Sequence, residues 1–275
     1  MATLNSTLEN AFTPEDYGKL IDTEVSAKSV AFQAATVVET DKHQVRFPIL
    51  VSDPATGWYA ENSPITLVDP ETDEIVVVPA KVAGLTQVSN EAVDDTEPAV
   101  AAQIGRALAR DIGKKIDAAF FGNTVTNGPS GLLSVSGIQV VDTGAGWTTL
   151  DYVHDAKSQA MANGAELTHI VLAPDVALAL SKAKTGTGSN QGLLETVDDG
   201  VKLGGLIALV SPAVTAGNAW ALDRSQVMTV RRKGTTVRQS KDAAFGSDAT
   251  QIRAVSRVSF GYANPAGIVR LHDAA

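Results

Sequence analysis

The chain has 275 residues, a net charge of −9 at pH 7, 44% hydrophobic residues and no cysteine. The hydrophobic content is enough for one large domain or two smaller ones, and the missing cysteines exclude disulfides, thiolate metal sites and a cysteine nucleophile. The negative charge argues against a protein whose task is to grip nucleic acid, because phosphate neutralisation needs clustered Lys and Arg. The apolar runs are shorter than the ~20 residues of a membrane-spanning helix. The N-terminus lacks the basic and apolar blocks of a secretory signal, so we expect synthesis in a cytoplasm and no membrane contact.

The charges are distributed unevenly along the chain. No basic residue lies between Arg46 and Lys81, whereas residues 224–241 hold a dense group of basic side chains. The acidic residues of the first segment are Asp53, Glu61, Asp69, Glu71, Asp73 and Glu74. The basic residues of the second segment are Arg224, Arg231, Arg232, Lys233, Arg238 and Lys241. One segment is therefore acidic and another basic.

Residues 1–40 contain one short helical candidate, which begins at Thr13-Pro14 with a capping Thr and a Pro in the first turn. Their apolar content is too sparse for a core of their own, which predicts an arm that lies on something else. Residues 43–89 are β-branched and alternating, with interspersed Pro residues that cannot donate to a ladder. This pattern predicts one long two-stranded hairpin. A flank of about 16 residues at ~3.3 Å each spans ~50 Å, so the hairpin must rest on another molecule or be disordered.

The middle of this hairpin reads TGWYAENSPI and places Trp58 beside Tyr59, although the chain has only three Trp and four Tyr. An adjacent Trp-Tyr pair carries a large apolar area that normally lies in a core or an interface. The surrounding Gly57 and Pro64 are typical of a turn. The pair either anchors the hairpin to another molecule or packs across its own hairpin.

The strongest helical pattern covers residues 97–121, with Thr96 as a cap, Pro98 in the first turn and Gly122 after the end. Its apolar residues recur every fourth position, so the apolar stripe winds around the helix. Residues 138–224 alternate helical and strand patterns, with a loop at 186–192 that we expect to be mobile. Residues 225–275 are rich in β-patterns, and 227–240 predict a hairpin that turns at Lys233-Gly234.

Motifs for catalysis are lacking. No Walker loop or serine-hydrolase elbow occurs, and GTGSNQG at 186–192 matches the dinucleotide fingerprint only loosely. The four His residues have none of the close pairings that metal sites show. Paired carboxylates such as those at 94–95 and 198–199 are expected by chance among 31 acidic residues. The sequence therefore predicts a protein that is not an enzyme and needs no cofactor or metal.

The order of these segments resembles the major capsid proteins of tailed bacteriophages, which have the HK97 fold. The resemblance covers roughly residues 45–272 and rests on five short motifs in the family's order. These are GWYAENSPI, VSNEAVDD, DAAFFGN, GPSGLL and RAVSRVSFGYANPAGIVRL. They are similar to the family's W-x-x-E, S-x-E-x-x-x-D, D-x-x-x-x-G and P-x-G-[IL] motifs and to its closing strand.

The resemblance implies an α+β HK97-like capsid fold. Residues 1–40 would be the N-terminal arm, 41–83 the extended loop, and 84–137 a peripheral domain with its spine helix at 97–121. Residues 138–224 would form the axial α/β domain, and 225–275 would return to the peripheral domain. The implied function is a shell protein that assembles through pentamers and hexamers into an icosahedral capsid around double-stranded DNA. It would lie in the virion capsid, and in the host cytoplasm during assembly.

On this reading Trp58 and Tyr59 would anchor the extended loop to a neighbouring subunit, as aromatics do in dry interface centres. The acidic residues Glu61, Asp69, Glu71, Asp73 and Glu74 would lie over basic residues of that neighbour, giving register and orientation. Two basic groups are candidates: Arg231, Arg232 and Lys233, or the helical stripe Arg106, Arg110 and Lys114. The alternative is that these basic residues only solvate a surface or meet packaged DNA.

The resemblance also names partners: a portal protein, non-specifically contacted packaged DNA, and possible separate scaffolding and decoration proteins. Some relatives weld subunits through a loop Lys and a neighbour's Asn. Residues 47–80 contain no Lys, so we expect no such cross-link and no covalent ladder on a denaturing gel. The motifs begin within about 45 residues of Met1, so we expect no fused scaffold. An encapsulin-like compartment and a homo-oligomeric α/β enzyme are the alternatives.

Overall fold

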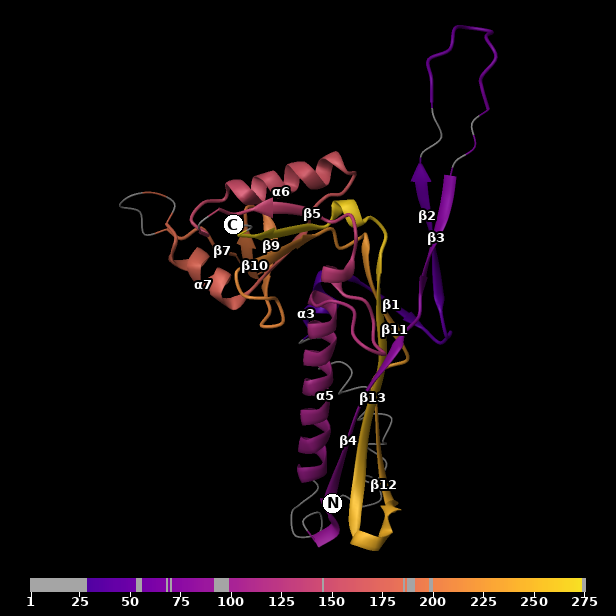
Figure 1. Ribbon diagram of the computed structural model, residues 1–275, viewed down its shortest axis with the longest axis vertical. Coiled ribbons are helices and arrows are strands. Elements are labelled where there is room, and N and C mark those ends of the chain that lie inside the picture. Colours follow the sequence, from indigo (N-terminus) through magenta and orange to yellow (C-terminus); the bar gives the residue numbers. More distant parts are fainter. Residues whose placement is uncertain are drawn as a thin grey trace, which may run out of the picture.

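The computed structural model describes residues 29–52, 56–67, 69, 71–91, 99–144, 146–184, 186, 191–197 and 200–273. The helix predicted at Thr13-Pro14, the cap at Thr96 and most of the loop 186–192 lie outside these ranges. The described part is elongated, with a long helix and a narrow sheet along the long axis, a second sheet beside one end, and a projecting hairpin (Figure 1).

The narrow sheet is built around one long strand, β13 (Ala249–Tyr262). Along one edge β13 pairs with β4 (Ala80–Ser89). Along the other edge it pairs first with β12 (Thr236–Ala244) and then with β11 (Val227–Arg232), and β1 (Thr36–Thr40) adds to β11 in parallel. The sheet order is therefore β1-β11-β13-β12, with β4 on the free edge of β13.

The prediction of a β-hairpin that turns at Lys233-Gly234 is wrong. Strands β11 and β12 do not pair with each other, because Arg231 pairs with Val258 and Thr236 with Val255, so both follow the same edge of β13. Lys233 has a φ of 54°, which supplies the expected turn geometry. The turn only interrupts the edge strand, since β13 with its 14 residues is long enough to pair with both pieces. The hairpin partner of β12 is β13, joined to it through η2 (Phe245–Ser247).

The helix α5 (Ala99–Phe121) lies along the narrow sheet (Figure 1), within the predicted range. Ile112, Ile116 and Phe120 of the fourfold apolar pattern are buried. The helix approaches β4 closely at Gly84, where an added Cβ would lie 3.0 Å from the Leu108 side chain. A side chain at position 84 would require the Leu108 side chain to shift.

The second sheet has the order β5-β14-β10-β6-β9-β8-β7. Its strands are β5 (Gln139–Asp142), β6 (His169–Leu172), β7 (Glu195–Val197), β8 (Gly200–Leu203), β9 (Leu206–Val210), β10 (Asn218–Leu222) and β14 (Val269–His272). The helices α6 (Asp151–Ala162) and α7 (Pro174–Lys182) belong to this unit. The predicted α/β character of residues 138–224 is thus present in the element order.

The end of the chain departs from the expected return of residues 225–275 to the first unit. Strands β11, β12 and β13 lie in the narrow sheet, but β14 pairs with β5 and β10 in the second sheet. The reason is local: η3 (Pro265–Gly267) turns the chain directly after β13, and β14 is fully apolar on its buried face. One chain end therefore ties the two sheets together.

The third sheet is the two-stranded hairpin of β2 (Val45–Ser52) and β3 (Glu71–Val77), which projects away from the rest of the molecule (Figure 1). The sequence predicted that the second strand of this hairpin continues to residue 89. That prediction is wrong, because the strand ends at Val77. At Val78-Pro79 the chain leaves the hairpin, and β4 pairs with β13 instead. Pro79 cannot donate to a ladder, so it ends the pairing with β2.

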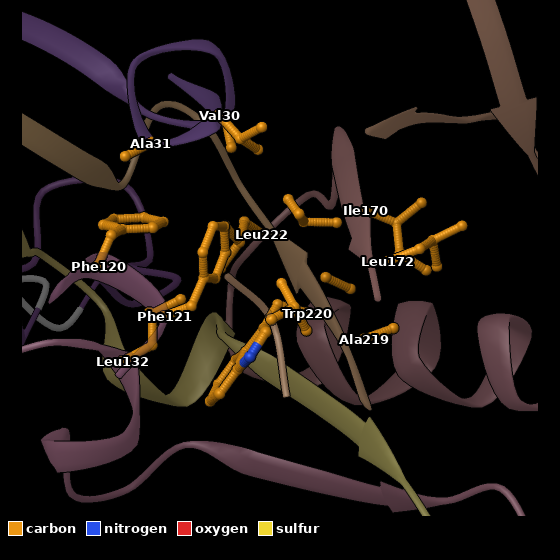
Figure 2. Packing of buried hydrophobic residues seen from close by; sticks show 14 of the residues in the cluster. Val30, Ala31, Phe120, Phe121, Leu132, Ile170, Leu172, Ala219, Trp220 and Leu222 are labelled. Atoms are coloured by element: carbon orange, nitrogen blue, oxygen red, sulfur yellow. The ribbon is translucent and has the colours of Figure 1, made fainter. Parts of the chain in front are cut away.

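One apolar core lies where α5, the second sheet and the short helix α3 (Val30–Ala34) meet (Figure 2). Val30 and Ala31 of α3 approach Phe120 and Phe121 at the end of α5, and Leu222 follows next in the same cluster. Residues 30–35 were expected to belong to an arm resting on something else. They are instead part of the subunit's own core, because four of the five α3 residues are apolar and buried.

Candidate assembly surfaces

The tip of the β2–β3 hairpin carries uncovered apolar side chains. Trp58 is 105% exposed, Leu67 90% and Ile65 77%. Tyr59 is less exposed, at 43%, and its hydroxyl accepts a hydrogen bond from the Thr66 amide at 3.4 Å. The interpretation that Trp58 packs across its own hairpin is therefore not what the structure shows. A fully exposed Trp leaves a large apolar area in water unless another molecule covers it.

The tip has a defined turn although its apolar side chains are exposed. The Ser63 amide and hydroxyl both donate to the Ala60 carbonyl, at 3.1 and 2.7 Å. Asn62 takes a φ of 63°, a conformation that Asn tolerates better than most residues. Together with the bond from the Thr66 amide to the Tyr59 hydroxyl, these bonds close the turn at the tip.

The acidic side chains that the structure describes in the hairpin region are exposed: Glu61, Asp69, Glu71, Asp73 and Glu74; Asp53 lies outside the described residues. Glu74 pairs with Arg46 of the opposite strand at 2.6 Å. Within the described ranges the other four take part in no ion pair. The hairpin therefore presents net negative charge beside the apolar tip.

The basic residues predicted at 231–233 have different environments. Arg231 is buried, pairs with Glu39 of β1, and lies over the Phe32 ring with 5.6 Å between the guanidinium carbon and the ring centre. Arg232 donates to the Asp41 carbonyl at 3.2 Å, and Lys233 is exposed. The charge of Arg231 is thus already met within its own subunit, by residues that hold β1 and α3 in place.

The helical stripe Arg106, Arg110 and Lys114 is exposed along one face of α5, as expected from the spacing of four residues. It lies on the helix surface turned away from the narrow sheet, because Gly84 of the sheet faces the opposite, Leu108 side of α5. The structure does not bring this stripe together with the acidic hairpin in one subunit (Figure 1).

Asp117, near the end of α5, has a role that sequence reasoning did not identify. Its buried carboxylate accepts hydrogen bonds from the Ser29 hydroxyl at 2.6 Å, the Ala31 amide at 3.0 Å and the Val30 amide at 3.2 Å. The carboxylate therefore caps the first turn of α3 from another helix. Burial raises the pKa of Asp117 above its ordinary value of 3.8, against the lowering effect of the three hydrogen bonds. The signal was in the sequence, as the first residue of the D-x-x-x-x-G motif.

One surface cleft of about 390 Å³ lies between the starts of β1 and β6 and the turn after β10. One of its two acidic side chains, Asp223, accepts hydrogen bonds from the Ser225 amide and hydroxyl and from the amide of the other, Glu166. Burial, followed by the nearby charge of Arg224, lowers the pKa of His169 below its ordinary 6.5. The polar groups of the cleft thus stabilise a turn.

Two further searches of the described residues concern other function classes. No group of three or more His, Cys, Asp or Glu side chains in these ranges could hold a metal ion. No helix within them is both long and apolar enough to cross a bilayer.

Comparison with known proteins agrees with this architecture. The family model described as "Phage capsid family" matches residues 10–273. No curated protein matches the chain in sequence. The chain belongs to the phage capsid family, as the resemblance of its motifs predicted.

Solved capsid structures share the fold. The capsid of a native GTA particle is 20% identical, with a TM-score of 0.72, and the match covers 90% of this chain and 91% of that one. A chain from Mycobacterium phage Adephagia is 16% identical, with a TM-score of 0.73 and 89% of both chains covered. A chain from Microbacterium phage Oxtober96 is also 16% identical, with a TM-score of 0.70 and coverage of 86% and 85%. The α+β fold is thus that of HK97-like capsids, and the protein is a structural, non-enzymatic component of a virion shell.

Proposed function

We propose that this chain is the major capsid protein, which self-assembles through pentamers and hexamers into an icosahedral shell around double-stranded DNA. The observation that carries the proposal is the projecting hairpin, whose tip exposes Trp58, Ile65 and Leu67. A monomer would leave these side chains in water, whereas a shell of overlapping subunits covers them. Family membership favours a phage shell over an encapsulin-like compartment.

The same proposal assigns positions to the two units. The unit around α5 and the narrow sheet would be the peripheral domain, and the unit around the seven-stranded sheet the axial domain. The hairpin would be the extended loop that reaches a neighbouring subunit. A portal protein, a separate scaffolding protein and a decoration protein are the expected partners, and DNA contact would be non-specific because the chain carries a net charge of −9.

Electron microscopy of the chain expressed alone, after size exclusion, tests the assembly proposal. We expect closed shells, or separate rings of five and six subunits. A small dimer or tetramer without rings would contradict it. Particles purified from infected cells should contain a long double-stranded genome, and a shell filled with protein cargo would show the encapsulin-like alternative instead.

Trp58→Ala tests the part played by the tip. Because Trp58 is fully exposed, its removal should leave the melting temperature of the unassembled subunit unchanged and should reduce the yield of particles. Aromatic anchors at interface centres contribute about 2 kcal/mol or more. The matched control is Phe245→Ala, since Phe245 is 87% exposed and lies on η2 of the narrow sheet. Unchanged particle yield from the Trp58 variant would rule out the anchoring role.

A further inference from the structure

The exposed side of α5 is basic, although the chain as a whole carries a net charge of −9. From Gln103 to the end of the helix, the charged residues that are exposed are four cations and one carboxylate. The cations are Arg106, Arg110, Lys114 and Lys115, here called the basic face of α5, and the carboxylate is Asp111. The ion pairs made among the described residues include none of these five side chains. The positive charge of this face is therefore not met within the described part of the subunit.

The basic face of α5 lacks the composition of a protein–protein interface. The uncharged residues exposed beside its cations are Gln103, Ala107 and Ala118, so no exposed side chain there is both large and apolar. The centres of protein interfaces are enriched in aromatic residues and depleted of Lys. The acidic hairpin is a poor partner for this face, because Trp58 and the other apolar side chains at its tip need an apolar surface to cover them. The basic face of α5 therefore fits a partner that is anionic and polar throughout.

The spacing of the cations suits a nucleic-acid backbone. Each residue adds about 1.5 Å along a helix axis, so Arg106, Arg110 and Lys114 follow one another at steps of about 6 Å and span about 12 Å. One strand of duplex DNA carries a phosphate every ~3.4 Å of its axis, so this span lies opposite about four phosphates. The 23-residue helix already holds the cations in a row. Binding would therefore order only the basic side chains and no loop.

We propose that the basic face of α5 binds the phosphate backbone of the packaged double-stranded DNA. This inference rests on the proposed function and deepens it, because it assigns the DNA contact to one surface of the subunit. It also replaces the role of hairpin landing site that the sequence indicated for Arg106, Arg110 and Lys114. Phosphate contacts carry no sequence information, so the binding is non-specific and depends on salt. The net negative charge of the chain keeps the contact of one subunit weak, and the many copies in a shell add their contacts.

Binding of a short, fluorescently labelled DNA duplex to purified subunits tests the proposal in a salt series. The logarithm of the binding constant should fall with the logarithm of the salt concentration, with a slope of about −3 to −4 for three or four phosphates. Arg106→Ala with Arg110→Ala should make the slope shallower by about 2, whereas Arg106→Lys with Arg110→Lys should keep it, because only the charge counts. The matched control is Arg253→Ala with Arg257→Ala, two exposed cations of β13, and should also keep the slope.

Two results of this experiment would overturn the proposal. One is a natural chain whose binding to the duplex does not depend on salt, and the other is an unchanged slope in the Arg106 and Arg110 alanine variant. Thermal melting of each variant checks that the subunit is folded, so that a lost slope reports lost charge. Duplexes of different base composition should bind within about twofold of each other, because the contacts are to phosphate.

Photo-cross-linking in particles from infected cells tests the contact in the assembled state. A photo-reactive residue replaces Ala107, which is exposed on α5, and after irradiation we expect covalent complexes between protein and DNA. The matched control has the same residue in place of Leu85, which is 62% exposed and faces away from α5 because its neighbour Gly84 faces the helix, and should give none. Cross-links from position 107 to protein instead of DNA would overturn the proposal.

Electron microscopy and the DNA content of the same particles separate this inference from the proposed function. Filled shells without a DNA cross-link at position 107 would refute the DNA contact alone. Absence of shells, or shells without DNA, would refute the proposed function. In that case the salt dependence of duplex binding by purified subunits still decides whether the basic face of α5 binds DNA.

Discussion

Removal of the Asp117 carboxylate should loosen the attachment of α3 to the end of α5. Three hydrogen bonds end on this side chain, from the Ser29 hydroxyl and the Val30 and Ala31 amides. Each is expected to contribute about 1 kcal/mol net, and the donors are buried, so they cannot turn to water when the acceptor is gone. Asp117→Ala should therefore lower the free energy of unfolding by about 3 kcal/mol, partly offset by removal of a buried charge.

Urea unfolding of unassembled subunits measures this change, at protein concentrations too low for assembly to stabilise the folded state by mass action. Ser29→Ala is the matched control: it deletes one donor and should cost about 1 kcal/mol. Hydrogen exchange should rise at residues 30–35 more than in β6 and β10, because the lost cap belongs to α3. If the free energy of unfolding of Asp117→Ala lies within about 0.5 kcal/mol of the value for the natural chain, the capping role is refuted.

The raised pKa of Asp117 makes the stability of the subunit depend on pH. Its folded-state pKa lies above the ordinary 3.8, so the folded state binds the proton more tightly than the unfolded state does. The contribution of this titration to stability is complete below pH 3.8 and is lost as the pH rises through the folded-state pKa. The stability of the natural chain relative to Asp117→Asn should therefore decline across that range, and a difference that stays flat with pH would contradict the raised pKa.

Two further substitutions test contacts that stabilise the folded subunit. Arg231→Ala should lower the free energy of unfolding by about 2 kcal/mol, chiefly because it removes the buried packing of Arg231 against Phe32; the Glu39 side chain is 70% exposed and stays hydrated without its partner. Arg232→Ala should change the free energy of unfolding by less than about 1 kcal/mol, and equal urea midpoints for the two variants would disprove this. Gly131→Ala should cost about 2 kcal/mol or more, since a Cβ there would lie 2.1 Å from the Ala119 carbonyl oxygen. Normal thermal melting of that variant would show that the loop shifts freely.

The sequence predicted elements well where one local pattern decides the structure. The helix at 97–121 and the strand-helix order of residues 138–224 follow from apolar periodicity, which each segment carries by itself. Strand pairing depends on distant partners, and here the prediction failed. Lys233-Gly234 has the composition of a hairpin turn, but the 14-residue β13 is long enough to pair with both flanking strands along one edge, so they do not pair with each other.

In the candidate assembly surfaces too, the sequence predicted features that depend on local pattern and missed those that depend on distant partners. Trp58 was identified because an exposed-looking loop rarely carries an adjacent Trp and Tyr. The burial of Arg231 could not be predicted, because its partners Glu39 and Phe32 lie almost two hundred residues earlier in the chain. The pairing of Lys81 with Arg257 was also beyond the sequence, since these residues become neighbours only through the register of β4 and β13.

The long strand β13 has a mechanical consequence. It is held along both edges in the narrow sheet, and after η3 the same chain continues as β14 in the second sheet. Tension applied between the two units would run along the strands, so many hydrogen bonds would have to shear together, whereas a peeling force breaks them one after another. Resistance to such a force depends on the unfolding rate rather than on equilibrium stability. The connection between the two units should therefore resist a force along β13 more strongly than a force that peels β13 from its neighbouring strands.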